Sequence, residues 1–309
     1  MSRTLSPETA GSSAERPSTE RSTKRRGSGA PREKLMSRTA AMIVMFVSTI
    51  YFLLPVWWLF TSATKSREDF GSSNGLLFAD FDLFTNIGNL FAYNDGIYLR
   101  WMLNSILYAG AGALIGTVIS AMCGYALAKY RFPGRELIFN VVLGGVLVPA
   151  TALALPLFLI FSQVGATNTF WAVFLPSLVN PFGVYLARIY AAASVPDELL
   201  EAARLDGSGE VRTFFTLARR LMTPALVTIF LFQFVAIWNN FFLPLIMLRD
   251  EALFPVTLGL YTWNSQVNQI PEIRTYVIIG ALMSIIPLII AFLSLQRFWQ
   301  SGLGSGSLK

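Results

Sequence analysis

Six long apolar stretches, separated by polar and charged segments, dominate the chain. They cover about residues 39–61, 101–128, 136–163, 170–190, 222–247 and 274–296. Each is close to or above the roughly 20 residues that an α-helix needs to cross about 30 Å of hydrocarbon. The pattern predicts an all-α polytopic membrane protein with six transmembrane helices in residues 39–296 and a short cytoplasmic tail at 297–309.

The first 38 residues have a different composition. They contain nine Lys and Arg, four Asp and Glu, many Ser, Thr, Pro and Gly, and almost no large apolar side chain before Leu35. A segment with so little to bury predicts a disordered basic tail. No aromatic residue is interleaved with the basic ones, so a cytoplasmic tail is favoured over a nucleic-acid-binding arm.

The amino-acid composition excludes several kinds of catalytic and metal-binding site. Of 309 residues, 54% are hydrophobic and 14% charged, histidine is absent, and Cys123 is the single cysteine. These facts exclude histidine metal ligands, Ser-His-Asp catalysis and an internal disulfide. No nucleotide-binding, metalloprotease or Cys-x-x-Cys motif occurs. The sequence therefore predicts no cofactor, no metal and no enzymatic activity in this chain.

The basic residues predict the orientation in the membrane. Nineteen of the 24 Lys and Arg lie in the tail and in the connections on the same side of the six stretches as the tail, and five lie on the other side. Because Lys and Arg accumulate on the cytoplasmic side, both termini should be cytoplasmic. The expected location is the cytoplasmic membrane of a bacterium.

Proline and glycine interrupt the apolar stretches. Prolines should kink five of the six helices, which is typical of a moving transporter rather than of a passive anchor. The second stretch carries glycines instead, and Gly112 and Gly116 would allow close helix contact. The prolines are Pro55, Pro149, Pro156, Pro176, Pro181, Pro244 and Pro287.

The apolar stretches contain amides but no charged residue, apart from Glu136 and Arg274 at their edges and Arg188 near the end of the fourth. Carriers driven by protons or Na⁺ usually bury charged groups at the membrane midplane. Amides instead match an uncharged, hydroxyl-rich solute, with the energy source located elsewhere. Our candidates for a solute path are Asn180, Gln233, Trp238, Asn239 and Asn240.

Helical spacing ranks these candidates. Gln233 and Asn240 are seven residues apart and would share one helix face, whereas Asn239 would point away by about 100°. Trp238 would serve as an aromatic platform or as a packing anchor. For Asn239, a helix cap or a hydrogen bond between helices is an equal alternative.

The cytoplasmic segment at about 191–221 predicts a compact helix-turn-helix. Pro196 suits the first turn of a helix and Gly207 suits its carboxyl-terminal cap. In a second helix starting near Ser208, one face would carry Val211, Phe214, Phe215 and Ala218. An interfacial helix lying on lipid headgroups is the alternative.

Three motifs carry a resemblance to a known family. Glu201-Ala202-Ala203, Asp206-Gly207 and Phe214 resemble the EAA loop of ATP-binding cassette (ABC) importer permeases. The stretch 236–245, AIWNNFFLPL, and the ending from Gln296-Arg297 through Gly302, Leu303, Gly304, Ser305 and Gly306 to Lys309 resemble the carbohydrate branch, with permeases of the MalG type. The resemblance covers about residues 39–309.

The resemblance implies a type I ABC importer permease for a sugar or oligosaccharide. It implies a heterodimer with a second permease, two cytoplasmic ATPase subunits or domains that bind ATP and Mg²⁺, and an extracytoplasmic solute-binding protein or lipoprotein. Residues 196–218 would form the coupling helix, and the glycine-rich tail would reach the ATPases. Where the family commonly has Leu-Pro, this chain has Arg219-Arg220, which affects the junction into the fifth helix.

Three other functions remain open at this point. A secondary carrier would need a complete pathway, preferably with an internal repeat, and would leave the EAA-like loop unexplained. A structural membrane subunit would need neither broken helices nor amides. Within the importers, a permease for glycerol 3-phosphate or a glycerophosphodiester is the nearest alternative.

Overall fold

The computed structural model describes residues 30–304, which are mainly helical and contain no β-strand. The chain divides into two units, Met1–Leu54 and Pro55–Lys309, and helix α1 (Ala30–Ala63) passes from the first into the second. The expectation of disorder up to residue 38 is wrong from Ala30 on, because Arg32, Glu33, Lys34 and Leu35 are strong helix formers. The rest of that tail lies outside the described residues.

Fifteen further helices follow within the described chain. They are α2 (Asp69–Ser72), α3 (Leu83–Ala92), α4 (Ile97–Ile106), α5 (Gly112–Lys129), α6 (Arg135–Gly144), α7 (Ala150–Gln163), α8 (Phe170–Ser177), α9 (Pro181–Ser194), α10 (Asp197–Leu205), α11 (Glu210–Thr213), α12 (Arg219–Leu221), α13 (Thr223–Trp238), α14 (Phe242–Met247), α15 (Val256–Gln266) and α16 (Ile273–Gly304). Short π-helical turns at 107–111 and 214–218 join α4 to α5 and α11 to α12.

Four helical segments of the described chain are long and apolar enough to cross a membrane, namely Arg38–Ala63, Leu83–Lys129, Phe170–Ser194 and Ile273–Gln296. The number of spans rises to six if each of two bent helix pairs is one span. The bent pairs are Arg135–Leu147 with Ala150–Gln163, at 103°, and Glu210–Leu221 with Thr223–Trp238, at 88°. The first bend is sharper than a proline kink because Val148, which precedes Pro149, is extended at ψ 119°.

The fifth apolar stretch is also not one helix. The sequence predicts a helix over about 222–247, but α13 ends at Trp238 and α14 begins only at Phe242. With 16 residues, α13 is about 24 Å long. Residues 239–241 therefore form a break between α13 and α14.

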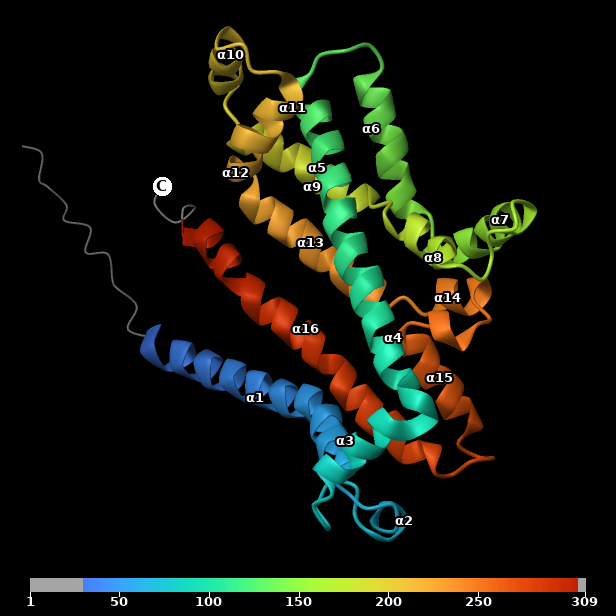
Figure 1. The fold of residues 1–309 in the computed structure, drawn as a ribbon. Coiled ribbons are helices and arrows are strands. Elements are labelled where there is room, and N and C mark those ends of the chain that lie inside the picture. The colour runs from blue at the N-terminus through green and yellow to red at the C-terminus, as the bar shows by residue number, and fades with distance from the viewer. Residues whose placement is uncertain (1–29, 305–309) are drawn as a thin grey trace, which may run out of the picture. The chain divides into compact units, whose positions relative to one another are not determined.

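The long helix formed by α4 and α5 organises the second unit. As Figure 1 shows, α5 runs beside α9 and α13, and α13 in turn packs on α16. Glycines make the approach close: a Cβ atom built on Gly124 would lie 2.6 Å from the Cβ of Ala187, and one built on Gly112 would lie 3.0 Å from Ile237. The close helix contact expected from the glycines of this stretch is confirmed.

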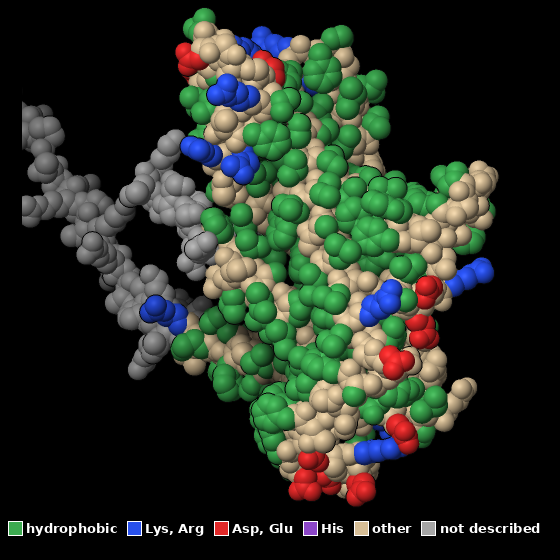
Figure 2. Space-filling model, in the orientation of Figure 1, with side chains coloured by type: hydrophobic (Ala, Val, Ile, Leu, Met, Phe, Trp, Pro, Cys, Tyr) green, Lys and Arg blue, Asp and Glu red, His purple; other side chains and the backbone are tan. Residues whose placement is uncertain are grey.

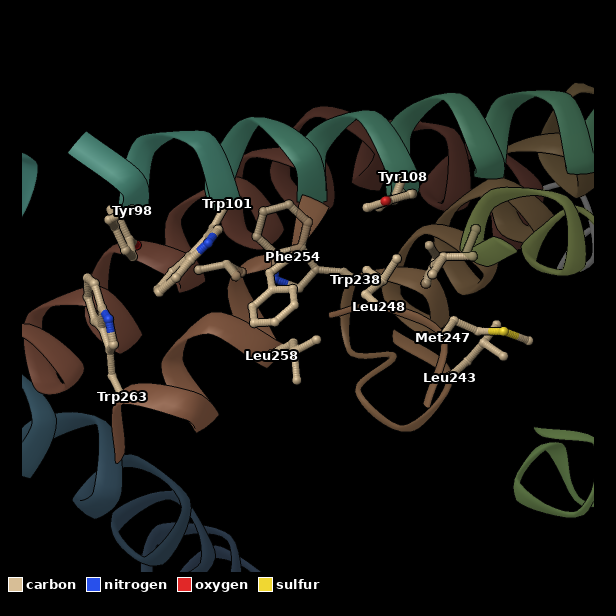
Figure 3. Close-up of a cluster of buried hydrophobic side chains, with 14 of the residues drawn as sticks. Tyr98, Trp101, Tyr108, Trp238, Leu243, Met247, Leu248, Phe254, Leu258 and Trp263 are labelled. Atoms are coloured by element: carbon tan, nitrogen blue, oxygen red, sulfur yellow. The ribbon is translucent and has the colours of Figure 1, made fainter. Parts of the chain in front are cut away.

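An aromatic cluster fixes the end of α4 that lies away from α10 (Figure 3). The ring centroids of Trp101 and Trp263 are 4.6 Å apart, and both side chains are buried. The polar atoms are satisfied as well, since Trp101 Nε1 donates to Glu251 O at 2.7 Å and Tyr98 OH donates to Gly280 O at 2.8 Å. These contacts tie α4 to α15 and α16 and give α5 a rigid base.

Charged side chains gather toward the two ends of the second unit. Figure 2 shows hydrophobic side chains between them, with mostly Lys and Arg near α10 to α12 and a mixture of acidic and basic side chains toward α2 and α15. This distribution is typical of a membrane-embedded protein, whose middle faces hydrocarbon.

Candidate functional site

The turn that ends α10 has the geometry expected for a helix cap at Gly207. Gly207 is left-handed at φ 75°, Ser208 N donates to Ala203 O at 2.9 Å, and Gly207 N donates to Arg204 O at 3.0 Å. These two hydrogen bonds define a Schellman motif, in which only glycine avoids a steric penalty. The expected cap at Gly207 is confirmed, whereas Pro196 lies just before the helix instead of in its first turn.

One face of α10 is exposed. Glu198, Glu201, Ala202 and Leu205 follow the i, i+3, i+4, i+7 spacing and are all solvent-accessible, Leu205 to 90%. Asp206 and Gly207 are exposed beside them, while Ala203 and Leu200 are buried on the opposite face. The sequence reading missed Leu205, although its position four residues after Glu201 would have placed it on this face.

The face expected in the second short helix is divided. Phe214 and Ala218 are buried at 3% and 0%, whereas Val211 is 61% and Phe215 40% exposed. The expectation of one apolar face is wrong because the π-helical turn at 214–218 changes the residue spacing. Phe214 packs on Tyr125 of α5, with ring centroids 5.3 Å apart, so it anchors the loop to α5.

A cavity of about 580 Å³ lies beside the end of α13, between it and the segment joining α8 to α9. Three of the five expected solute-path residues line it, namely Asn180, Gln233 and Asn240. No ionisable side chain is among its lining residues. The other lining residues are Ala150, Ser177, Val179, Phe182, Phe232, Ala236 and Ile237.

Asn180 and Gln233 form one wall through hydrogen bonds. Asn180 caps α9 by accepting from Gly183 N at 2.9 Å, and its Nδ2 donates to Gln233 Oε1 at 3.2 Å. Gln233 Nε2 donates to Ser177 O at 3.0 Å, and Gln233 is only 5% exposed. The backbone of Gly116 on α5 lies so close that a Cβ there would overlap the Gln233 amide.

Asn240 is bound less firmly. Its Oδ1 accepts one long hydrogen bond of 3.4 Å from Leu243 N, and its Nδ2 donates to no group in the part of the chain that the structure describes. Asn240 follows the end of α13, so the expected shared helix face with Gln233 is wrong, although both side chains line the same cavity.

The other two expected path residues lie elsewhere. Trp238 is 3% exposed and stacks on Phe234, with ring centroids 5.7 Å apart. Asn239 Nδ2 donates to Val235 O at 2.9 Å, which is the helix-cap alternative. Neither residue is among those that line the cavity.

An aromatic pair on the cavity wall was missed by the sequence reading. Phe182 and Phe232 meet edge to face at 6.0 Å between ring centroids and are 42% and 51% exposed. Phe182 follows Asn180 by two residues and Phe232 precedes Gln233 directly. Their positions next to Asn180 and Gln233 in the sequence could have indicated them. However, the apolar stretches contain many phenylalanines, and no local feature distinguishes these two from the others.

The structure describes only some of the carboxyl-terminal residues that are expected to contact the ATPases. Gly302, Leu303 and Gly304 form the last residues of α16, which extends beyond the expected end at 296. Ser305 and Gly306 lie outside the described residues.

Comparison with known proteins gives the family. Residues 116–302 match the model of the "binding-protein-dependent transport system inner membrane component" family. The arabinooligosaccharides transport system permease protein AraQ of Halalkalibacterium halodurans is 36% identical over 214 residues, which cover 69% of this chain and 75% of the relative. AraQ of Bacillus subtilis is 32% identical over 273 residues, 88% of this chain and 96% of the relative. The lactose transport system permease protein LacG of Rhizobium radiobacter is 30% identical over 263 residues, which cover 85% of this chain and 93% of the relative.

A solved structure supports the fold. A chain of a bacterial ABC transporter involved in the import of the acidic polysaccharide alginate superposes with a TM-score of 0.76 at 22% identity and covers 87% of this chain and 98% of its own. The expected type I ABC importer permease fold is confirmed. The chain belongs to the family of binding-protein-dependent transport system inner membrane components, the permease subunits of ABC importers.

Proposed function

We propose that this chain is one of two permease subunits of an importer for a neutral sugar or oligosaccharide, and that solute passes along the cavity beside the end of α13. The uncharged, amide- and phenylalanine-lined wall carries the proposal. A volume of about 580 Å³ is within the range of small-molecule sites. Amides match sugar hydroxyls, and an exposed phenylalanine face matches the apolar face of a pyranose ring.

The absence of charge from the lining separates this proposal from its alternative. A glycerol 3-phosphate or glycerophosphodiester permease would need a cation near the phosphate, and none of the ten residues that line the cavity is Lys or Arg. Two relatives belong to arabinooligosaccharide and lactose systems, and these solutes are also uncharged. Both lines of support favour a neutral solute.

The chain would supply movement but no catalysis. ATP and Mg²⁺ would bind to two partner ATPase subunits in the cytoplasm, and a second permease would complete the path. An extracytoplasmic binding protein would deliver the solute; a related transporter has been solved in complex with an alginate-bound periplasmic protein. The exposed face of α10 would dock on the ATPases, with Leu205 as its apolar contact and Glu201 as its charged one. Both termini would lie in the cytoplasm of a bacterium.

The experiment is solute uptake by the purified complex in liposomes, with Asn240→Leu compared against Asn239→Ala. Losing one hydrogen bond to the solute, about 1 kcal/mol, should raise the half-saturating sugar concentration roughly fivefold in Asn240→Leu. Asn239→Ala removes the neighbouring amide, which caps α13 away from the cavity, and should leave that concentration unchanged.

Two outcomes would contradict the proposal. Equal uptake kinetics in Asn240→Leu, Phe232→Ala and the unmodified chain would assign solute recognition to the partner permease. Uptake of glycerol 3-phosphate, with no sugar competing, would establish the alternative.

A further inference from the structure

The last turn of α5 contacts the first residue of α10. Lys129, at the end of α5, donates to Asp197, with 2.7 Å between Nζ and Oδ1. The Lys129 side chain is 7% exposed, whereas that of Asp197 is 72% exposed. The Lys129 ammonium holds the pKa of Asp197 below its usual range. The ion pair therefore anchors an exposed helix end to a nearly buried cation.

A second contact reaches the other end of α10. Tyr130 OH donates to Glu210 Oε2 at 2.7 Å, and Glu210 Oε1 accepts from Arg204 Nε at 2.8 Å in the last turn of α10. Burial and the hydrogen bond to Glu210 raise the pKa of Tyr130 far above its ordinary value. The phenol thus remains a proton donor throughout the physiological range.

Apolar packing supports these polar contacts. The Tyr125 ring lies between Tyr130 and Phe214, at centroid distances of 5.8 and 5.3 Å. The start of α10 is therefore held directly by Lys129 at the end of α5, and its last turn is held through Glu210 of α11 by Tyr130, the residue that follows α5.

The other part of α5 lies against the cavity wall. Gly116 contacts the Gln233 amide, and Gly124 contacts the backbone of α9, where a built Cβ would lie 2.7 Å from Val184 O. From Lys129 to Gly116 the helix spans 13 residues, or about 20 Å. A continuous helix therefore connects α10 to the hydrogen-bonded pair of Gln233 and Asn180.

We infer that Lys129 and Tyr130 are positioning residues that clasp α10 to α5, so that the two helices move as one body and ATPase-driven motion reaches the cavity wall along α5. This inference rests on the proposed function, because it assumes that α10 receives that motion. The number of solute molecules transported per ATP hydrolysed distinguishes this positioning role from a purely structural one. A merely structural ion pair would change assembly or thermal stability but not that ratio.

The first test reverses the charges in the reconstituted complex. Lys129→Glu should lower solute transported per ATP at least tenfold while solute-stimulated hydrolysis continues. Lys129→Glu with Asp197→Lys should restore at least a third of the ratio, and Lys129→Arg should retain most of it. Arg212→Ala, which removes an exposed cation of α11 instead, is the control. An unchanged ratio in Lys129→Glu would overturn the inference, as would failure of the double variant to improve on the single ones.

A second test applies even where charge reversal prevents assembly. Lys129→Cys and Asp197→Cys, in a Cys123→Ala background, are joined by a short bifunctional thiosulfonate. If the two helices move as one body, the crosslinked complex should keep at least half of its uptake. Loss of uptake on crosslinking, reversed by reductant, would show that the helices separate in each cycle and would overturn the inference.

The experiments can refute the proposed function and the clasp independently of each other. If the complex containing the unmodified chain takes up no sugar, the proposed function is wrong whatever Lys129 does. If it takes up sugar and the charge-reversed or crosslinked variants behave contrary to expectation, only the clasp is wrong.

Discussion

Replacing Gly207 by valine should loosen the end of α10 without disturbing any packed side chain. Gly207 has φ 75°, and no heavy atom lies within 4 Å of the position its Cβ would occupy. The perturbation is thus backbone strain alone. A Cβ in the left-handed region costs about 1–2 kcal/mol, and a β-branched side chain costs more.

The alternative to strain is loss of the cap. If residue 207 moved to a negative φ, the bonds from Gly207 N to Arg204 O and from Ser208 N to Ala203 O would break. At about 0.5–1.5 kcal/mol each, their loss would cost about 1–3 kcal/mol. Either way the intact turn should be destabilised by about 1–3 kcal/mol, a factor of roughly 5–150 in its population.

Gly209 offers a matched control two residues away. It also has open space around its Cβ position, but its φ of −70° and ψ of 154° suit valine. Hydrogen exchange of the peptide 197–208 should accelerate at least fivefold in Gly207→Val and less than twofold in Gly209→Val. Uptake should fall only in Gly207→Val, and Gly207→Asn should be milder because asparagine tolerates this conformation. Equal exchange in both valine variants would refute the reasoning.

Three further predictions concern other parts of the chain. Deleting residues 302–309 should weaken ATPase association or stimulated hydrolysis, measured by co-purification and phosphate release; unchanged turnover would assign these residues to a dispensable end. Cysteines introduced at Ser72 and Arg131, both exposed, in a Cys123→Ala background should react with an impermeant maleimide from opposite sides of the membrane; reaction of both from outside would contradict the orientation. Asn168→Gly should lower the melting temperature by a few degrees while Asn168→Asp should not, because Oδ1 accepts from the backbone amides of Arg249 and Asp250 at 2.8 and 2.9 Å; equal melting of the two variants would show that these bonds are not important.

Features encoded within a few neighbouring residues were predictable from the sequence. The cap at Gly207 requires a left-handed backbone that glycine favours, and the spans follow from runs of apolar residues. Both signals are local, so neither depends on what the segment packs against. The exposed face of α10 belongs to the same class, since helical spacing alone puts Leu205 beside Glu201 and Ala202.

Features set by contacts between distant segments were not predictable. Helical periodicity puts Phe214 and Val211 on one face, yet the π-helical turn buries Phe214 against Tyr125 and leaves Val211 in solvent. The Lys129 clasp joins residues 68 positions apart. The sequence around Lys129 does not indicate that Asp197 is its partner, and the sequence around Asp197 does not indicate Lys129. Each is one of many charged residues at a helix end.

The amides show why residue type alone overestimates a solute path. Inside a bilayer an unpaired amide is costly, so an amide bonds first to another protein group. Asn180 and Gln233 satisfy each other across 53 residues, and Asn239 bonds the helix that it ends. Asn240 differs because it lies where the backbone leaves α13: it lines the cavity, and its Nδ2 donates to no group within the described chain. Among the described residues, the path candidate whose amide keeps an unpaired donor, Asn240, therefore lies where the fifth span breaks, beside the cavity at the end of α13.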